Sequence, residues 1–142
     1  MKKTFFNESA QILFLGKVWS YLFQKPNVDT PETLDEFNAG FRIWDEKTDT
    51  WTYGENNPGV TFAGVQAKMA ELKAAEPMRL LRLERDRLLK ESDWMVLPDR
   101  TPTQAQLDYR QALRDLPETQ AANAAIDEAG NLINVVWPTK PE

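Results

Sequence analysis

The side chains in this sequence that could do chemistry are mostly carboxylates, and two clusters stand out. Glu32, Asp35 and Glu36 have the spacing of paired acid and base groups. They also lie just inside a predicted helix start, where the helix dipole favours acidic residues. That explanation is sufficient, so we do not predict catalysis by this cluster.

The second cluster, Asp45, Asp49 and Glu55, invites comparison with a calcium-binding loop. Such a loop requires oxygen ligands at positions one, three and five, and glycine at position six. Lys47 occupies the third position and Thr50 the sixth. We therefore interpret this segment as a solvated loop and predict no metal site.

Cysteine and histidine are both absent from the 142 residues. Their absence excludes disulfides, thiolate nucleophiles and zinc sites built from these residues. It also excludes a Ser-His-Asp triad and an imidazole base near neutral pH. We expect a non-enzymatic protein that uses no cofactor or metal.

The charge distribution argues against nucleic acid as the main partner. The net charge is −5, with 17 basic and 22 acidic residues shared evenly between the two halves of the chain. A protein that grips phosphates needs a positive excess on one region. The basic run from Arg79 to Lys90 is interrupted by Glu84 and Asp86 and followed by Glu91, and Asp86 and Glu91 are expected to pair with it at i, i+4. No apolar stretch reaches the roughly 18 residues that span a bilayer, so we expect no membrane partner.

The first 77 residues are predicted to form an aromatic-rich docking region. Ser9–Phe23 has helical spacing with Ser9 as N-cap, although its aromatic and β-branched residues also suit a strand. Trp19 and Phe23 belong to the best candidate for a partner surface, with core packing as the open alternative.

A short helix and a β-hairpin follow in this half. Thr30 and Pro31 predict a helix start, and that helix runs to about Asn38. The segments on either side of the loop at 45–50 predict a hairpin over residues 41–53, in which Trp44 and Trp51 pair across the strands.

The remainder of the chain is predicted to be mainly helical. A helical region with an apolar stripe from Phe62 begins at Thr61 and continues to about Glu91, and Pro77 ends or kinks the helix. Thr101 predicts a second start, with a capping box to Gln104, and Pro117 a stop. The fold class is thus mainly α, within α+β: a long kinked helix, a C-terminal helical hairpin over 78–116, the small β-hairpin and a short extended tail at 132–137. The Ala-rich segment 121–129 is helical or loosely ordered.

Four motifs in the last 65 residues resemble a known family when they are taken in order. They are Leu80–Leu89, then Ser92-Asp93-Trp94 with Leu97-Pro98, then Tyr109–Pro117, and finally Val136-Trp137-Pro138 with Lys140-Pro141. This pattern is similar to the C-terminal module of phage tail assembly chaperones and tail-fibre-associated proteins. It covers residues 78–142, and it departs from the family in the Ala-rich stretch 119–129. Two domains, 1–77 and 78–142, are therefore expected.

The resemblance implies a protein that binds other phage tail or tail-fibre proteins. We expect a structural or adaptor protein that is retained in the tail of the virion and is present in the host cytoplasm during assembly. The alternative is a transient chaperone that leaves the virion; a third possibility is a small regulatory or nucleic-acid-binding protein. A homo-oligomer is also possible.

The motif residues have a structural interpretation of their own. Trp94 is expected to cap the apolar space between the two helices, and Tyr109 to face the core. Trp137 is expected to pack across the open side of the hairpin.

Two arginines are the expected fasteners of the hairpin. Arg110 and Arg114 share a helix face, within reach of a carboxylate at Asp93, Asp99 or Asp115. A guanidinium that binds a carboxylate at the turn would fix the angle between the helices.

Overall fold

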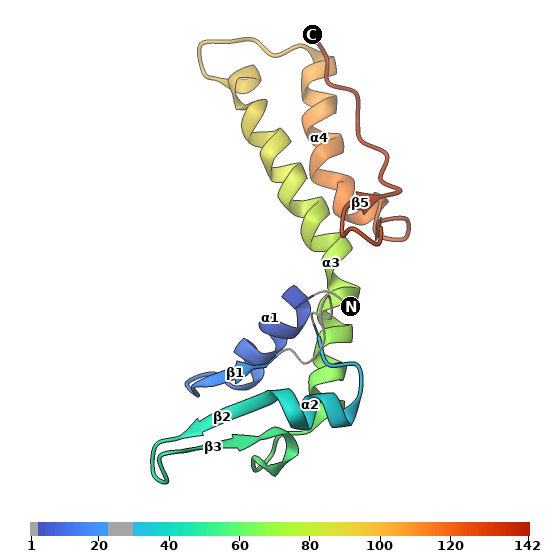
Figure 1. Cartoon of the computed structure of the whole chain (residues 1–142). Coiled ribbons are helices and arrows are strands. Elements are labelled where there is room, and N and C mark those ends of the chain that lie inside the picture. Colours follow the sequence, from blue (N-terminus) through green and yellow to red (C-terminus); the bar gives the residue numbers. More distant parts are fainter. Residues whose placement is uncertain (1–2, 23–29) are drawn as a thin grey trace. The chain divides into compact units, whose positions relative to one another are not determined.

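The computed structural model describes residues 3–22 and 30–142. They divide into two compact units, Met1–Lys73 and Ala74–Glu142, and one long helix contributes to both. Phe23, a predicted interface residue, lies outside the described residues. The predicted mainly α fold with a small antiparallel sheet is confirmed (Figure 1).

The first unit combines short helices with a three-stranded antiparallel sheet in the order β1-β2-β3. Its elements are α1 (Lys3–Leu13), β1 (Trp19–Tyr21), α2 (Leu34–Gly40), β2 (Phe41–Asp45), β3 (Thr50–Tyr53), a 3₁₀ turn η1 (Gly54–Asn56) and the start of α3 (Phe62–Glu91). The predicted hairpin is confirmed, with Trp44 opposite Trp51 in the register of β2 and β3.

Phenylalanine rings fill the core of this unit. Phe6, Phe37 and Phe41 are fully buried. The Phe37 ring stacks on Phe41 at 5.0 Å between centroids, and on Phe62 of α3 at 5.3 Å. Much of the aromatic content of this half therefore stabilises its own fold, since large rings bury the most apolar area per residue.

The prediction of one helix over Ser9–Phe23 is wrong. The helix begins at Lys3 and ends at Leu13, Gly16 turns the chain with a φ of +80°, and Trp19–Tyr21 is a strand. Ser9 is not an N-cap: its buried hydroxyl donates to the carbonyl of Phe5 one turn earlier in α1. The strand alternative was the correct one for the second part of the segment.

The predicted start of α2 is also misplaced. Thr33, not Thr30, is the N-cap, and its hydroxyl accepts a hydrogen bond from the backbone N–H of Glu36. Thr30 is followed by Pro31 and Thr33 by the acidic first turn of α2, so each resembles an N-cap in the sequence. Thr30 is instead buried, at 5% exposure.

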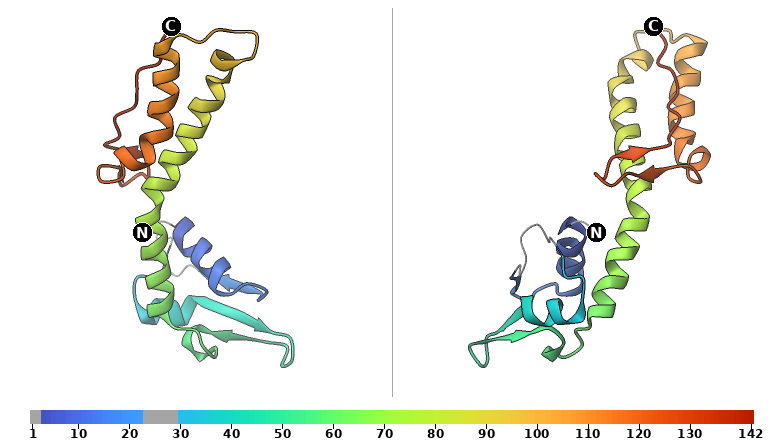
Figure 2. Two further views of the ribbon diagram at one scale, coloured as in Figure 1. Left: turned by 180° about the vertical axis from the view of Figure 1, so that it is seen from behind. Right: turned by 45° about the vertical axis from the view of Figure 1, so that its right-hand side comes forward.

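The second unit is a helical hairpin closed by a small sheet. It contains the remainder of α3, a 3₁₀ turn η2 (Asp93–Val96), α4 (Gln104–Thr119), β4 (Ala125–Ile126) and β5 (Leu132–Ile133). β4 and β5 pair antiparallel, where the sequence predicted a helical or loosely ordered Ala-rich segment. The chain after β5 runs beside the hairpin in both views of Figure 2, and we call residues 132–142 the C-terminal strap.

Both helices of the hairpin contain a proline. The predicted long helix is confirmed, since α3 continues through Pro77. The predicted stop at Pro117 is wrong, because α4 continues to Thr119. Each proline removes one backbone hydrogen bond, and the end of α4 is still closed by the N–H of Gln120, which donates to the carbonyl of Leu116.

The core of the second unit lies between the two helices, the turn and the strap. Its buried residues are Leu81, Met95, Tyr109, Leu113 and Leu116; those packed around them include Met78, Leu88, Leu89, Ala124, Leu132, Val135 and Trp137. Among the described residues, no helix is long and apolar enough to cross a membrane.

The N-cap of α4 provides a direct test of the hairpin's start. Thr103 and Gln106 form a complete capping box, two residues later than the predicted Thr101 and Gln104. Replacing Thr103 with Ala is expected to lower the free energy of unfolding by about 1 kcal/mol, because an N–H at the helix end loses its acceptor. Urea denaturation of the full chain measures this. Thr101→Ala is the matched control and should change little; an equal loss in the two variants would contradict the assignment.

Candidate functional site

The end of α3 is held by an arginine from the other helix. Arg110 in α4 is 7% exposed. Its Nη1 donates to the carbonyl of Leu89 at 2.9 Å and to the hydroxyl of Ser92 at 2.8 Å. Its Nη2 donates to Asp93 Oδ1 at 3.0 Å. The guanidinium therefore adds a charged donor to the Leu89 carbonyl at the negative end of the helix dipole, and ties the turn to α4.

The turn between the helices directs neighbouring side chains to opposite sides. Met95 is 1% exposed and fills the core, whereas Trp94 is 39% exposed. The guanidinium of Arg100 lies over the Trp94 ring, at 4.9 Å from its centroid. The prediction that Trp94 caps the space between the helices is therefore wrong, because η2 places Met95 there instead.

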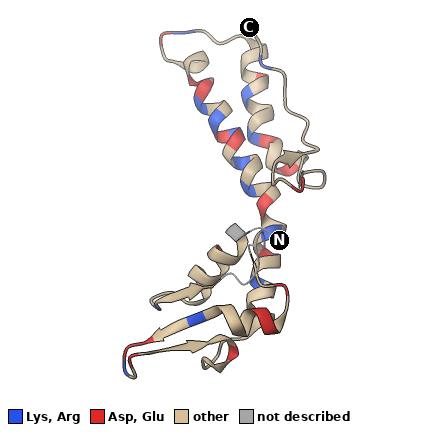
Figure 3. Cartoon of the chain, in the orientation of Figure 1, with Lys and Arg blue, Asp and Glu red and all other residues tan. Residues whose placement is uncertain are grey.

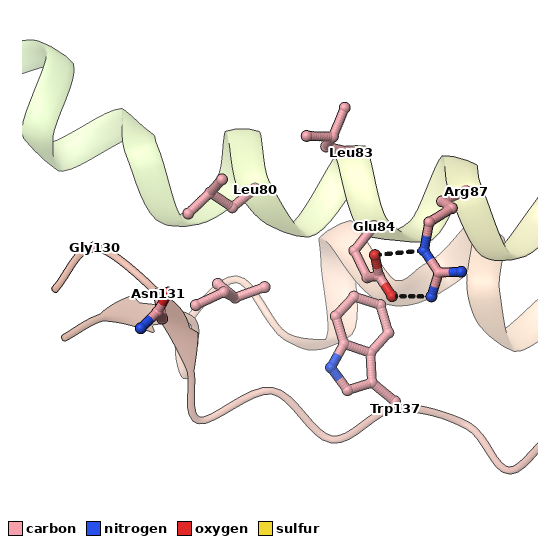
Figure 4. A pocket seen from close by; sticks show the side chains of 8 residues that line it. Leu80, Leu83, Glu84, Arg87, Gly130, Asn131 and Trp137 are labelled. Carbon is pink, nitrogen blue, oxygen red and sulfur yellow. Dashed lines mark hydrogen bonds and ion pairs between the residues drawn. The ribbon is translucent and has the colours of Figure 1, made fainter. Parts of the chain in front are cut away.

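An open groove of about 590 Å³ lies between α3 and the C-terminal strap (Figure 4). Its lining comes from two distant parts of the sequence: Leu80, Leu83, Glu84 and Arg87 of α3, then Gly130, Asn131, Leu132 and Trp137. In Figure 4 the Trp137 ring lies beneath the pair formed by Glu84 and Arg87. Leu83 remains 62% exposed, so the groove is an accessible apolar surface.

Two charged side chains line this groove, and they pair with each other. Arg87 Nε donates to Glu84 Oε2 at 2.8 Å, and the same guanidinium pairs with Glu91 one turn further along. The hydrogen bonds from Arg87 hold the pKa of Glu84 below its usual value, so Glu84 is ionised at neutral pH. Acidic and basic residues alternate along this part of α3 (Figure 3).

The turn at the other side of the groove carries a further carboxylate. Asp127 Oδ1 accepts from the backbone N–H of Asn131 at 2.8 Å, and its second oxygen from the Asn131 side chain at 3.3 Å. Hydrogen bonds from this backbone lower the pKa of Asp127. The β4–β5 turn therefore presents a fixed negative charge beside the groove.

Comparison with known proteins identifies this part of the chain. A family model described as phage tail assembly chaperone protein matches residues 78–142, slightly under half of the chain. These residues are similar to phage tail assembly chaperones. The resemblance seen in the motifs is confirmed, and the protein has a role connected with the phage tail. No curated protein and no solved structure matches. We call residues 78–142 the chaperone module.

The family motifs of the chaperone module now have physical roles. Ser92 and Asp93 receive the hydrogen bonds from Arg110, and Tyr109 is buried at 5% exposure. Trp137 packs against the hairpin core, as expected. Val136 beside it is 72% exposed, although its N–H donates to Gln120 Oε1.

Arg114 does not share the role of Arg110. Its Nη1 lies 3.5 Å from Gln111 Oε1, on the exposed face of α4, and Asp115 instead accepts from Gln111. Of the three expected carboxylates, Asp93 is the one that Arg110 binds. Arg110, and not Arg114, therefore connects α4 to the turn of the hairpin.

The aromatic candidates of the first unit lie on both sides of its sheet. Trp19 contacts the core rings Phe6 and Phe41. Trp44 and Trp51 pack edge to face at 5.2 Å. Arg42 lies over the Trp51 ring at 4.1 Å from the centroid. All three tryptophans are half-buried.

Sequence reasoning missed Ser92, Met95 and the α3 side of the groove as functional positions. In the sequence Ser92 and Leu80 stood out only as members of the family motifs. Ser92 is fully buried in the structure, and Leu80 lines the groove. Nothing local marks these residues, because their partners lie on α4 or the strap. Among residues 3–22 and 30–142, no group of three or more acidic side chains is placed to hold a metal ion.

The arginine cap predicts a large difference between two arginine variants. Arg110→Lys is expected to destabilise the protein by about 3 kcal/mol, since an ammonium cannot reproduce the three forked hydrogen bonds and leaves the buried Ser92 hydroxyl without its donor. Arg114→Lys should be nearly neutral. Thermal and urea unfolding followed by circular dichroism measure both. Equal stabilities of the two variants would show that the cap contributes little.

The turn predicts a similar contrast between two adjacent residues. Met95→Ala is expected to cost about 2–5 kcal/mol, because it opens a cavity in the core. Trp94→Ala should cost about 1 kcal/mol or less, since it loses mainly an exposed cation–π contact. Chemical denaturation of the full chain gives both values. A larger loss at Trp94 than at Met95 would overturn the described turn.

Proposed function

We propose that this protein is a non-enzymatic assembly chaperone that binds a phage tail or tail-fibre protein through its chaperone module. The supporting observation is that the family match and the accessible apolar groove fall on the same unit. Exposed apolar surface next to fixed charges is typical of a protein-binding site. The partner is another tail protein, met in the host cytoplasm during assembly.

The chemistry of the chain supports binding over catalysis. It contains no cysteine or histidine. The acidic residues that resemble catalytic groups have structural partners instead: Glu36 accepts from the N–H of Glu32, and Asp45 from the N–H of Lys47. Glu55 accepts from the N–H of Phe62, the first residue of α3. These carboxylates serve as local caps of helices and turns.

Retention in the virion as a structural adaptor is the second candidate. The first unit favours it, because this unit has its own aromatic core and lies outside the family match. A unit of this kind offers a second surface, which a protein that joins two tail components needs. The even, net negative charge supports protein partners over nucleic acid for both candidates.

The two candidates differ in where the protein is found after assembly. Quantitative mass spectrometry of purified virions and of the crude lysate, with a major tail protein as internal standard, measures this. We expect the protein in the lysate and its absence from virions. Stoichiometric presence in virions would contradict the transient chaperone and support the retained adaptor.

The same lysate tests the underlying proposal. The full chain, carrying an affinity tag, should co-purify with one defined tail or tail-fibre protein that is identified by its mass spectrum. If no tail protein co-purifies and none is protected from aggregation on co-expression, the proposed function fails. The result is independent of whether the protein remains in the particle.

A further inference from the structure

The groove between α3 and the C-terminal strap has the dimensions of a site for a short peptide segment. Along α3 it extends from Leu80 to Arg87, a rise of about 10 Å at 1.5 Å per residue. About three residues of extended chain cover that length. Its volume of about 590 Å³ is within the range of specific binding pockets.

The walls of the groove are suited to an apolar anchor. Leu80, Leu132 and Trp137 line it. Trp137 belongs to the strap and is half-buried against the hairpin core. Leu83 at the outer edge stays mostly exposed. A large aliphatic or aromatic side chain would exclude water from all four of these residues, which is favourable in proportion to the apolar area covered.

Among the charged groups that line the groove or are bonded to a lining residue, carboxylates outnumber cations. Glu84 lines it, Glu91 follows one turn later, and Asp127 is fixed in the turn at its other side. Arg87 is the one cation among the lining residues, all of which lie in the described part of the chain, and it pairs with both glutamates. These four groups sum to −2, three carboxylates against one guanidinium.

We propose that this groove binds an extended segment of the tail protein in which a large apolar side chain is flanked by lysine or arginine. The apolar side chain enters between α3 and Trp137, and its basic neighbours lie near Glu84, Glu91 and Asp127. Complementary charge sets the orientation and the specificity, while the apolar contact supplies most of the affinity. This inference rests on the proposed chaperone function and names the chemistry of its partner.

Three synthetic peptides test the proposal on the full chain: Lys-Lys-Leu-Phe-Leu-Lys-Lys, the same apolar centre between glutamates, and the lysine-flanked peptide with alanines at its centre. Titrations followed by NMR report on the Trp137 indole and the Leu80 methyl groups. We expect the first peptide to bind at least tenfold more tightly than either of the others, and to weaken as salt rises.

Variants with matched controls separate the two contributions. Leu80→Ala together with Leu83→Ala should weaken binding of the first peptide about tenfold, whereas Leu107→Ala, an exposed leucine of α4, should not. Glu84→Gln should reduce the salt dependence, and Glu118→Gln, exposed on α4, should leave it unchanged. Unfolding curves of each variant check that the fold is retained.

Several outcomes would overturn the proposal. Equal binding of the glutamate-flanked peptide would remove its electrostatic basis. Shifts spread over the surface, or none at Trp137, would show that the groove holds only water. If an identified tail protein co-purifies equally with the wild type and the Leu80/Leu83 variant, the chaperone function stands and the groove is not its site. If the tail protein co-purifies with the wild type and not with the Leu80/Leu83 variant, both the chaperone function and the groove as its site are supported.

Discussion

The chaperone module depends on the contact between the guanidinium of Arg110 and the end of α3. A helix end leaves carbonyls without partners in the helix, and here the acceptors beside the second helix are the part-buried Leu89 O and the buried Ser92 Oγ. Arg110 supplies forked donors that reach both and Asp93 as well. Its Nε is buried without a partner among the described residues, a cost that the other three bonds offset. Because this contact sets where the turn leaves α3, it also decides that Met95 enters the core and Trp94 does not.

The two units build their small cores from different kinds of side chain. The first uses rings, and Phe41 contacts Phe6, Phe14, Phe37 and Trp19 from one strand position. The second uses mainly aliphatic side chains, and the buried Arg110 at its edge pairs with the exposed Asp93. The N-terminal aromatic residues had been weighed as core or partner surface. The phenylalanines among the described residues are core, and the half-buried tryptophans Trp44 and Trp51 are left partly exposed.

Local patterns in the sequence predicted the type of most elements better than their ends. The hairpin at 41–53 and the long helix through Pro77 follow from alternation and apolar spacing. The helix starts were placed two or three residues early, because Thr30 and Thr101 each precede a proline that mimics a first turn, whereas Thr33 and Thr103 make the bonds. For Arg110 the sequence narrowed the partner to three carboxylates. The groove was beyond prediction, since it joins residues 80–87 to 130–137 across an Ala-rich segment whose pairing as β4 and β5 has no strong local signal.

The strap that forms one wall of the groove is held less firmly than the helical hairpin. The Arg110 contacts span 17 to 21 residues of sequence, so the hairpin closes over a short loop. Trp137 reaches α3 across more than 50 residues, and β5 has a two-residue pairing with β4. Such a segment opens locally at a lower free energy than the helices beneath it. Whenever the strap detaches, one wall of the groove leaves with it while the hairpin persists. A bound segment could then be released by local unfolding, without an external energy source.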